Sequence, residues 1–547
     1  MEARVQDKET VLLDGHTLTI EQVVQAAHGR GGVYPIVALS AEAAEKIVRM
    51  REAIEKAVED KVMYGINTGA GVNRNRVVPA NLLHGYQRDY ILAHCVGDAP
   101  YLSKEITRAM MILRVNSFAV GHSGVTIELC ELILDLLNRD VIPAVPQFGS
   151  LGASGDLAPL AHLGAVLIGH AETHVWYRDE MRPTKDVLQE LSMEPYRLKA
   201  KEAMAITNGS TMTLAYACII VSEAEQLLRL ANLAAAMNME AIRGEKNAFD
   251  DRIHEARNQI GQRAVAEEIR ELLQGSARIT AKAQKVCLRH DSHKDCVEEC
   301  EQARVQDAYS IRCVPQIHGA FADALAYLRD IVAREVNAAT DNPLVFETAS
   351  EFEILSGGNF HGDTLAIPLD TIAISLAKLA NAANARLFRL INKHFSYGLP
   401  QDLSANDNSQ SSGFMIVQYA CLADALRASM LAAPASVFTG VTSGGQEDVV
   451  SNGASAAWKA FQIIDFVRNA LAKELLAVCQ AIDLGAEKLG SDLGQLGVGT
   501  EKAHKRIRRE VSMMRKDRYL RTDIQAIKAL IVSGDLCRAV FRNHGDK

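Results

Sequence analysis

The second half of the chain is dominated by long segments in which apolar residues recur at helical spacing. These segments span residues 210–242, 316–337, 367–394, 413–433 and 454–486. Apolar positions that recur every three or four residues predict helices, and long helices with few glycine or proline breaks pack as a bundle. We therefore expect residues 206–547 to form an elongated helical-bundle domain, with the charged stretch 487–520 as part of a C-terminal helical cap over the end of the bundle.

The first 205 residues show a more varied pattern. Residues 11–13 and 18–20 favour strands and flank Asp14-Gly15, a dipeptide typical of turns, so they predict two extended segments joined by a turn. A short hairpin is expected over residues 175–183. Helical spacing is found over residues 41–62, 80–97 and 104–138. We therefore expect a mixed N-terminal domain over residues 1–205, and a mainly α fold for the chain.

Charge and composition narrow the class of protein. The chain of 547 residues has a net charge of −8 and a pI of about 6.1, which disfavours a nucleic-acid binder because such proteins usually carry a basic stripe. The N-terminus lacks an apolar signal segment, and no uncharged apolar run is long enough to cross a bilayer. With ten scattered cysteines, these features predict a cytoplasmic protein with free thiols that binds neither nucleic acid nor a membrane.

Residues 149–160, GSLGASGDLAPL, combine three small residues in a row with flanking glycine and proline. Gly155 has no Cβ to oppose a strained turn. Such a turn can bring the Gly155 nitrogen to the carbonyl carbon of Ala153. For a bare Ala-Ser-Gly triplet, a turn before a helix, with Ser154 as N-cap or Asp156 in the first turn, is the simpler explanation. The neighbouring motifs therefore decide between the two readings.

Other segments carry candidate catalytic or binding side chains. Tyr64 begins YGINTGAG, a glycine-rich loop that can close a tyrosine base over a site. Arg312 in QDAYSIRCVPQ offers a planar guanidinium to a carboxylate, and Tyr309 and Gln306 precede it at spacings of three, on one face if the segment is helical. Three further motifs place a polar or aromatic residue beside turn signals: ITNGST with Asn208, TDNPLVF with Asn342 and GGNFHG with Phe360.

Together with the triplet, these motifs resemble those of the aromatic amino acid ammonia-lyase and aminomutase family, in the family's order and over roughly residues 10–490. In that family the Ala-Ser-Gly triplet becomes 4-methylidene-imidazol-5-one (MIO). The resemblance implies a fumarase/aspartase-like helical architecture and a homotetramer. It also implies MIO formed from residues 153–155 with no external cofactor. The implied reaction eliminates ammonia from a small-molecule L-α-amino acid to give the α,β-unsaturated acid.

The same resemblance implies roles for individual residues. The implied catalytic residues are Tyr64, Ala153, Ser154, Gly155, Asn208 and Tyr309. The implied substrate-binding residues are His94, Gln306, Arg312, Asn342, Phe360 and Glu447. Tyr64 matches the family's catalytic tyrosine, and Asn208 matches the asparagine that bonds MIO or the substrate carboxylate. Near Asn342 the chain departs mildly from the family, because Thr340 stands where asparagine is more usual.

Two positions bear on the ring of the substrate. His94 in YILAHCVG does not decide, because histidine enzymes and some tyrosine enzymes share this residue. Glu447 stands in Gln-Glu-Asp, as in histidine lyases, where phenylalanine and tyrosine enzymes have Asn-Gln-Asp. A carboxylate can pair with an imidazole, whereas against a phenyl ring it would be desolvated without a partner. The site residues are therefore closest to those of histidine ammonia-lyases, and histidine, giving urocanate, is favoured.

Two departures from the histidine enzymes keep alternatives open. Val449 stands where those enzymes usually have histidine, and residues 69–71 are Gly-Ala-Gly where they usually have Gly-Phe-Gly. A tyrosine or phenylalanine ammonia-lyase is one alternative, and an MIO 2,3-aminomutase that makes a β-amino acid is another. A catalytically inactive helical scaffold is the alternative from a different class.

Residues 287–300, CLRHDSHKDCVEEC, are rich in cysteine and histidine. They include Cys287, His290, His293, Cys296 and Cys300, an inventory that can ligate zinc. The spacing matches no standard zinc finger, and the stretch is highly charged. We therefore expect part of an outer loop near the site entrance and no metal.

Overall fold

A computed structural model of the chain describes residues 9–29, 32–60, 62–69, 71–286, 288, 305–349, 351–405 and 411–541. The chain divides into two compact units, each made of several chain segments. Unit 1 consists of Met1–Ser222, Leu328–Asp370 and Pro434–Trp458, and unit 2 consists of Glu223–Tyr327, Thr371–Ala433 and Lys459–Lys547. The boundary expected near residue 205 stays a prediction, and it lies within the first segment of unit 1.

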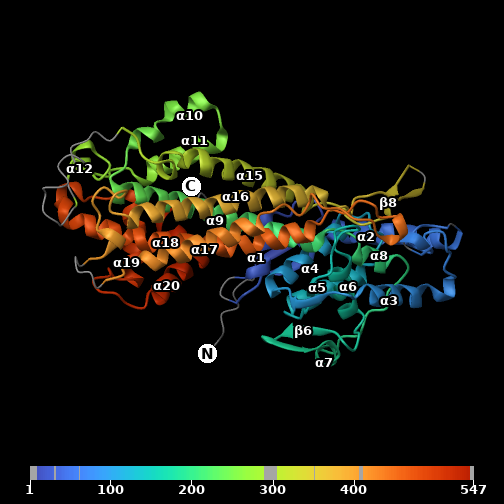
Figure 1. Cartoon of the computed structure of the whole chain (residues 1–547). Helices are drawn as coiled ribbons and strands as arrows, with labels where there is room; N and C mark the ends of the chain where they lie inside the picture. Colours follow the sequence, from blue (N-terminus) through green and yellow to red (C-terminus); the bar gives the residue numbers. More distant parts are fainter. Residues whose placement is uncertain are drawn as a thin grey trace. The chain divides into compact units, whose positions relative to one another are not determined.

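Unit 1 combines helices with small sheets (Figure 1). The helices wholly within it are α1 (Ile20–His28), α2 (Ala41–Asp60), α3 (Leu83–His94), α4 (Lys104–Ala119), α5 (Ile127–Asn138), α6 (Leu157–Leu167), α7 (Thr184–Glu190) and α8 (Glu202–Thr207). Its strands are β1 (Thr10–Leu13), β2 (Ile36–Leu39), β3 (Asp98–Tyr101), β4 (Ile142–Pro143), β5 (Pro146–Phe148), β6 (His174–Tyr177), β7 (Glu180–Pro183), β8 (Leu344–Glu347) and β9 (Phe352–Leu355). They pair as β1 with β2, β3 with β5, β4 with β6 and β7, and β8 with β9.

The turn expected at Asp14-Gly15 does not join two paired strands, so that prediction is wrong. Strand β1 pairs in parallel with β2 instead. Thr19 caps helix α1: its side chain accepts from the Gln22 nitrogen, and the Gln22 side chain accepts from the Thr19 nitrogen. This reciprocal capping box satisfies two amide donors at the start of α1, and it outweighs the weak strand preference of residues 18–20.

The helical spacing found over residues 104–138 corresponds to two helices, because α4 and α5 are separated by a short break. Gly121 and Gly124 lie between them with positive φ angles of 80° and 65°, which a continuing helix cannot include. Thr126 then caps α5 by accepting from the Leu129 nitrogen at 3.3 Å. The hairpin expected over residues 175–183 is confirmed, because β6 and β7 pair antiparallel there.

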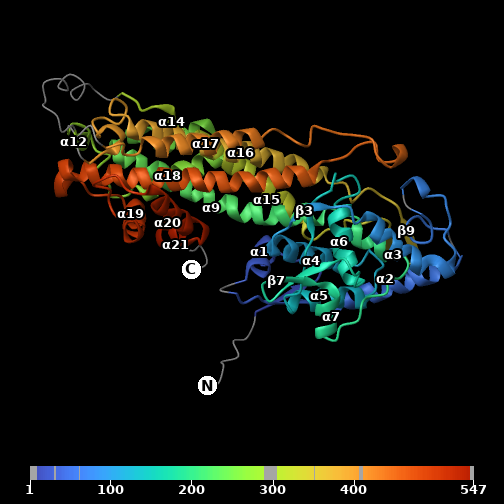
Figure 2. The same ribbon diagram turned by 60° about the horizontal axis from the view of Figure 1, so that its bottom comes forward.

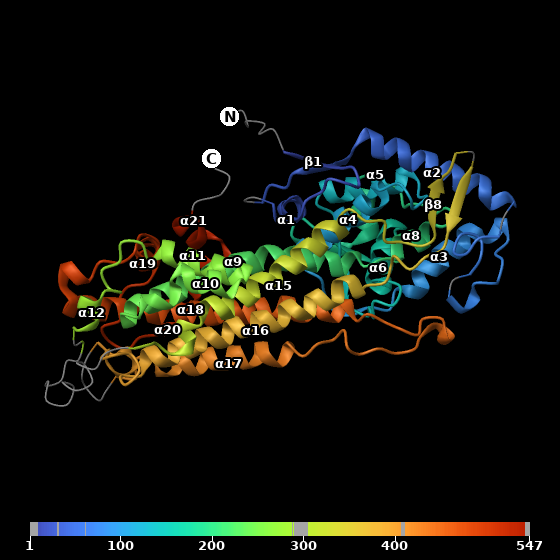
Figure 3. The ribbon, with the colours of Figure 1, turned by 90° about the horizontal axis from the view of Figure 1, so that it is seen from above.

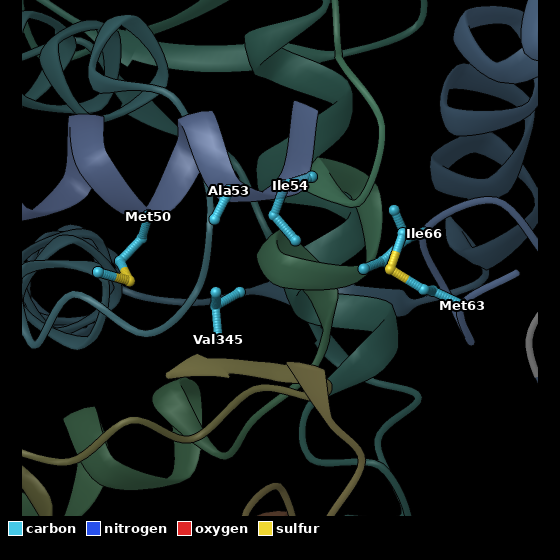
Figure 4. Packing of buried hydrophobic residues seen from close by; sticks show 6 residues of the cluster. All are labelled: Met50, Ala53, Ile54, Met63, Ile66 and Val345. Atoms are coloured by element: carbon cyan, nitrogen blue, oxygen red, sulfur yellow. The ribbon is translucent and has the colours of Figure 1, made fainter. Parts of the chain in front are cut away.

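A cluster of buried apolar side chains fixes the approach to the Tyr64 loop (Figure 4). Its members are Met50, Ala53 and Ile54 from α2, Met63, Ile66, and Val345 from β8. Met63 and Ile66 lie on either side of Tyr64 in the sequence, so their burial holds the start of the glycine-rich loop against α2 and β8. Hydrophobic packing therefore determines where the loop leaves the core.

Long helices form the core of unit 2. Helices α9 (Thr211–Ile242), α15 (Val314–Glu335), α16 (Asp363–Ile391) and α18 (Gly453–Leu493) each contribute residues to both units, and α17 (Met415–Leu431) lies wholly in unit 2. Within unit 2 these long helices lie side by side (Figures 2 and 3). Each predicted periodic segment corresponds to one of them, so the mainly α fold and its helical bundle are confirmed.

Shorter helices accompany the bundle in unit 2. They include α10 (Asp251–Arg257), α11 (Ile260–Leu272), α12 (Ala281–Gln284), α14 (Tyr309–Arg312), α19 (Val498–Glu510), α20 (Leu520–Val532) and α21 (Asp535–Val540). Helices α19, α20 and α21 contact one another, and α19 also contacts α11. The Gly497 nitrogen, just before α19, donates to Glu240 Oε1 of α9 at 2.7 Å. The charged stretch 487–520 thus contributes one helix, α19, to a small C-terminal group.

A buried polar network ties the long helices together inside unit 2. Glu474 of α18 accepts from Arg386 of α16 at 2.5 and 3.0 Å and from Asn238 of α9 at 2.6 Å. His318 of α15 bonds Asn232 of α9 at 2.7 Å. These side chains are buried, and a buried charge that loses its partner is strongly destabilising. The network therefore favours one register of the helices over slipped alternatives.

Among the described residues one helix, α16, is long and apolar enough to span a bilayer. Of its most apolar window, 67% is buried within the protein. That degree of burial is typical of a core helix in a bundle, which passes the same length and hydropathy criteria.

Ile54→Ala is expected to lower the free energy of unfolding by about 2–5 kcal/mol, because it removes a fully buried aliphatic side chain and leaves a cavity. Denaturant unfolding followed by circular dichroism measures the change. Val48→Ala on the same helix is the matched control, since Val48 is 41% exposed and its truncation should cost less than about 1 kcal/mol. Equal losses for the two variants would contradict the packing of α2 against β8.

Candidate active site

Backbone hydrogen bonds clamp the Ala153-Ser154-Gly155 triplet to residue 209. The Gly209 nitrogen donates to the Ser154 carbonyl oxygen at 3.1 Å, and the Asp156 nitrogen donates to the Gly209 carbonyl oxygen at 2.8 Å. Gly155 has a φ angle of 80°, and a Cβ there would lie 2.2 Å from the Gly209 carbonyl carbon. Only glycine fits this approach, so the triplet is held in a tight, left-handed turn.

Asp156 joins this loop to the first turn of α9. It occupies the N-cap position of α6, yet its carboxylate accepts from the Thr213 nitrogen at 2.8 Å and from Thr213 Oγ1 at 3.0 Å. Ser150 Oγ also donates to Asp156 Oδ1 at 2.9 Å. Burial raises the pKa of Asp156, while these hydrogen bonds oppose the rise. The loop and the start of α9 are therefore fixed to each other.

The Ser154 hydroxyl contacts a residue far away in the sequence. Ser154 Oγ donates to Glu447 Oε1 at 3.0 Å, and the N-cap position of α6 is occupied by Asp156 rather than by Ser154. Glu447 Oε2 accepts from Thr442 Oγ1 at 3.0 Å, and the Thr442 nitrogen donates to the Glu447 carbonyl at 2.8 Å. The carboxylate is thus oriented from one side and bonded to the triplet from the other.

The loop that begins with Tyr64 packs against the segment that precedes Glu447. The Gly71 nitrogen donates to the Tyr64 hydroxyl at 3.2 Å. A Cβ at Gly71 would lie 2.3 Å from Ser443 Oγ, and the short helices η1 (Gly71–Asn73) and η6 (Ser443–Gly445) contact each other. Tyr64 and Glu447 are therefore carried by adjoining loops. Ala70, the departure noted in the sequence, lies outside the described residues.

Helix α3 presents two rings to the same region. The rings of Tyr90 and His94 stack with centroids 4.1 Å apart, and His94 Nδ1 lies 2.7 Å from the Tyr90 carbonyl oxygen. Burial raises the pKa of Tyr90 above its ordinary value, and the neighbouring Tyr64 and Glu447 add to the rise. Sequence reasoning missed Tyr90, although its spacing of four residues from His94 placed both on one helix face.

Asn208 reaches the clamp from the end of α8. It is 4% exposed, and its carbonyl oxygen accepts from Arg114 Nη1 at 2.6 Å. Its side-chain Oδ1 is buried without a hydrogen-bond partner among the described residues. A buried amide oxygen without a partner is costly, so a bound group beside it would be stabilised by donating to it.

Asn342 and Phe360 are connected through the backbone around them. Asn342 Nδ2 donates to Ser356 Oγ at 3.1 Å, and Asn342 Oδ1 accepts from the Gly357 nitrogen at 2.6 Å. The Phe360 carbonyl accepts from Ser210 Oγ at 3.1 Å. Asn342 therefore holds the segment that leads to Phe360, and Phe360 is tied to the segment of Asn208.

Gln306, Tyr309 and Arg312 belong to unit 2, whereas the site residues above belong to unit 1. The Arg312 guanidinium carbon lies 4.9 Å from the centre of the Tyr309 ring, and Arg312 Nε donates to the Asp307 carbonyl at 3.1 Å. Helix α14 covers Tyr309–Arg312 only, and Gln306 lies before it, so these three residues do not share one helix face as expected. Tyr309 is 69% exposed.

The cysteine- and histidine-rich stretch stays a prediction, because Cys287, His290, His293, Cys296 and Cys300 lie outside the described residues. Within the part of the chain that the structure describes, no group of three or more histidine, cysteine, aspartate or glutamate side chains is arranged to hold a metal ion.

Comparison with known proteins extends over almost the whole chain. The family model described as "Aromatic amino acid lyase" matches residues 18–509. The chain is 40% identical over 531 residues to histidine ammonia-lyase of Chloroflexus aurantiacus, covering 97% of each. The solved histidine ammonia-lyase from Trypanosoma cruzi is 33% identical, with a TM-score of 0.85 over 97% of this chain and 95% of that one. Tyrosine aminomutase from Streptomyces globisporus is 32% identical, with a TM-score of 0.88 over 98% and 99%.

The chain therefore belongs to the aromatic amino acid lyase family. Within this family it is an ammonia-lyase, an enzyme that breaks a carbon–nitrogen bond. The family resemblance drawn from the motifs is confirmed, and an inactive scaffold is not needed to explain the fold.

Gly155→Ala is expected to abolish ammonia release and to destabilise unit 1. A left-handed backbone alone costs a non-glycine residue about 1–3 kcal/mol, and the new Cβ would also collide with the backbone of Gly209. Ammonia release and thermal melting are the measurements. Gly85→Ala in α3 is the control, because nothing lies within 4 Å of its Cβ position. A Gly155→Ala enzyme with full activity would show that the clamp is not required.

Proposed function

We propose that this ammonia-lyase is an MIO-dependent histidine ammonia-lyase, which converts L-histidine to urocanate and ammonia. The observation that carries the proposal is the 3.0 Å hydrogen bond from Ser154 Oγ to Glu447 Oε1. It puts a carboxylate, which can accept from an imidazole N–H, against the triplet that would become the reactive group. Relatives named histidine ammonia-lyase, 39–40% identical over nearly the full chain, support the same substrate.

Ring formation at the triplet would also favour an imidazole substrate at Glu447. Formation of MIO removes the Ser154 hydroxyl as water, and this frees Glu447 Oε1 for a donor from the substrate. Glu447 Oε2 keeps its bond from Thr442 Oγ1, so the carboxylate stays oriented. A phenyl side chain offers no donor, and the freed oxygen would then be desolvated without a partner.

The residues around the triplet fit an MIO group. Gly155 has the left-handed backbone that a tight turn needs, and Asn208 Oδ1 is a buried acceptor with no hydrogen-bond partner among the residues that the structure describes. Ala153, Ser154 and Gly155 supply every atom of the ring, so no external cofactor is required. When formed, MIO supplies an electrophile for the amino nitrogen of the substrate.

Tyr64 is assigned as the base that removes the β-proton of the substrate. The Gly71 nitrogen donates to its phenolic oxygen at 3.2 Å, and the same loop contacts residues 443–445, as a loop that closes over a site would. Asn208 lies next to the clamp, where its side chain can bond MIO or the substrate carboxylate.

Arg312 is assigned to bind the substrate carboxylate, because a guanidinium pairs bidentately with a carboxylate. The face of the Tyr309 ring and the Asp307 carbonyl orient that guanidinium. Gln306 and Tyr309 contribute further polar contacts from the same segment, with Tyr309 among the catalytic groups. The remaining substrate-binding assignments are His94, Asn342 and Phe360.

An aminomutase that returns ammonia to the β-carbon is the second candidate. The specific observation in its favour is the TM-score of 0.88 with tyrosine aminomutase from Streptomyces globisporus. Both reactions begin with removal of ammonia and differ in what happens to it afterwards. A tyrosine or phenylalanine lyase differs only in the ring that the pocket accepts. Product identity separates all three.

The exposed face of α17 supports assembly with other copies of the chain, for which the family resemblance implies a homotetramer. Large apolar side chains follow one face of this helix and are 37–78% exposed: Met415, Ile416, Tyr419, Leu422, Leu426 and Met430. A contiguous apolar stripe of this size favours burial against another subunit. The cytoplasmic location, and the absence of nucleic-acid and membrane partners, stay predictions.

Glu447→Gln is expected to lower kcat/KM for histidine by about 10- to 100-fold, because hydrogen bonds to charged groups contribute about 1.5–3 kcal/mol. Ammonia release from histidine, tyrosine and phenylalanine, with products identified by mass spectrometry, is the measurement. Asp448→Asn, an exposed neighbouring carboxylate, is the matched control and should change little.

The proposal is contradicted if the unaltered enzyme prefers tyrosine or phenylalanine, or if Glu447→Gln leaves histidine turnover intact. A β-amino acid as the main product would replace the lyase by the aminomutase.

Leu426→Lys combined with Met430→Lys is expected to convert the tetramer to smaller species, because two charges would be buried in an apolar interface. Sedimentation velocity measures the size. Val532→Lys adds a charge at an exposed apolar position of α20 and should leave the tetramer intact. An unaltered protein that sediments as a monomer would rule out the assembly.

A further inference from the structure

Arg114 of α4 is a fully buried arginine beside the clamp. Its Nη1 donates to the Asn208 carbonyl oxygen at 2.6 Å, and its Nη2 donates to Ser117 Oγ at 2.8 Å and to Thr340 Oγ1 at 3.4 Å. Its side chain is 0% exposed. Arg114 is not among the residues assigned to bind the substrate or to form MIO.

The surroundings of Arg114 are unusual for a buried cation. Among the described residues no carboxylate forms an ion pair with it, and its Nε has no hydrogen-bond partner. Burial lowers the pKa of Arg114 to about 10, with Asp341 and Asp156 opposing the drop, so the guanidinium stays charged at neutral pH. A buried charge without a direct ion pair is expensive, and the shortest hydrogen bond of Arg114 goes to a single backbone carbonyl.

The Asn208 carbonyl group belongs to the peptide that is hydrogen-bonded to the triplet. The Asn208 C=O and the Gly209 N–H belong to one peptide group and point in opposite directions. Arg114 bonds the first, and the second donates to the Ser154 carbonyl oxygen at 3.1 Å. Hydrogen bonds in such a chain polarise one another, and the link to a charged donor is the strongest. The positive charge therefore acts on the Ser154 carbonyl through one peptide.

We propose that Arg114 is a positioning residue for formation of the ring: it fixes and polarises the Asn208–Gly209 peptide, which in turn draws electron density onto the Ser154 carbonyl oxygen. The inference rests on the proposed MIO group. Arg114 lies outside the loop that carries residues 153–155, on helix α4 of unit 1.

The step is redox-neutral and balances within the chain. The Gly155 nitrogen bonds to the Ala153 carbonyl carbon, and the Ala153 oxygen leaves as water with the amide protons of Gly155 and Ser154. The Ser154 hydroxyl then leaves as a second water with the Ser154 α-proton. Loss of that proton places negative charge on the Ser154 carbonyl oxygen, where the Gly209 N–H receives it.

The test follows ring formation rather than turnover alone. Arg114→Met, Arg114→Lys and the unaltered enzyme are digested at intervals after expression, and mass spectrometry gives the fraction of the triplet peptide that is lighter by two water molecules. One oxyanion donor contributes about 10²–10³-fold, and Arg114 acts indirectly, so Arg114→Met should slow ring formation by about tenfold. Arg114→Lys should recover part of the rate.

Arg108 provides a matched control on the same helix. It is 1% exposed and bonds the Ala26 and Leu137 carbonyls and Asp140, none of which touches the clamp. Arg108→Met should lower the melting temperature and leave ring formation unchanged. If Arg114→Met does not fold, Arg114→Lys is compared with Arg108→Lys, and only the former should slow ring formation.

Each outcome has one meaning. Ring formation as fast in folded Arg114→Met as in the unaltered enzyme, or equal in the two lysine variants, overturns the role of Arg114 and leaves the proposed function standing. An unaltered enzyme whose triplet peptide keeps both waters overturns the proposed function itself.

Discussion

The close approach of two glycine backbones, at residues 155 and 209, is the constraint on which the rest of this site depends. Their separation leaves no room for a Cβ, and the two hydrogen bonds across it hold the triplet in its turn. Other elements act on this one contact. Asp156 ties the loop to the first turn of α9, and Arg114 of α4 holds the peptide that precedes Gly209. The scaffold of unit 1 thus holds the triplet in its tight turn through contacts with residues that are distant in the sequence.

Much of the fold could be predicted from the periodicity of apolar residues. Where the prediction differs from the structure, the cause is local. Long runs with apolar residues at helical spacing have one stable solution, so the bundle helices were predictable. Residues 18–20 lack that length, and the capping box of Thr19 decided their structure. The break between α4 and α5 depends on the positive φ angles of Gly121 and Gly124, within an apolar pattern that continues across it. The interleaved segments of the two units depend on contacts between distant residues, which no local pattern encodes.

The site was predictable where a residue belongs to a recognisable motif, and not where its partner is remote. The triplet and Glu447 stand in such motifs, yet the hydrogen bond that joins Ser154 to Glu447 crosses 293 positions of sequence. Arg114 lies in an ordinary helical segment, and its partner is a backbone carbonyl 94 positions away, which leaves no sequence signal. The sequence signal for Tyr90 was its spacing of four residues from His94, which places both side chains on one helix face. Motifs therefore identify the reacting groups, whereas the groups that hold and polarise them emerge from the packing.

The most direct measurement of the central claim is an electron-density map of the purified enzyme at residues 153–155. A closed five-membered ring, with the Ser154 side chain as a planar methylidene and the Ser154 carbonyl oxygen within hydrogen-bond distance of the Gly209 nitrogen, is the predicted result. Density for an open chain with an intact Ser154 hydroxyl in an active enzyme would contradict the account.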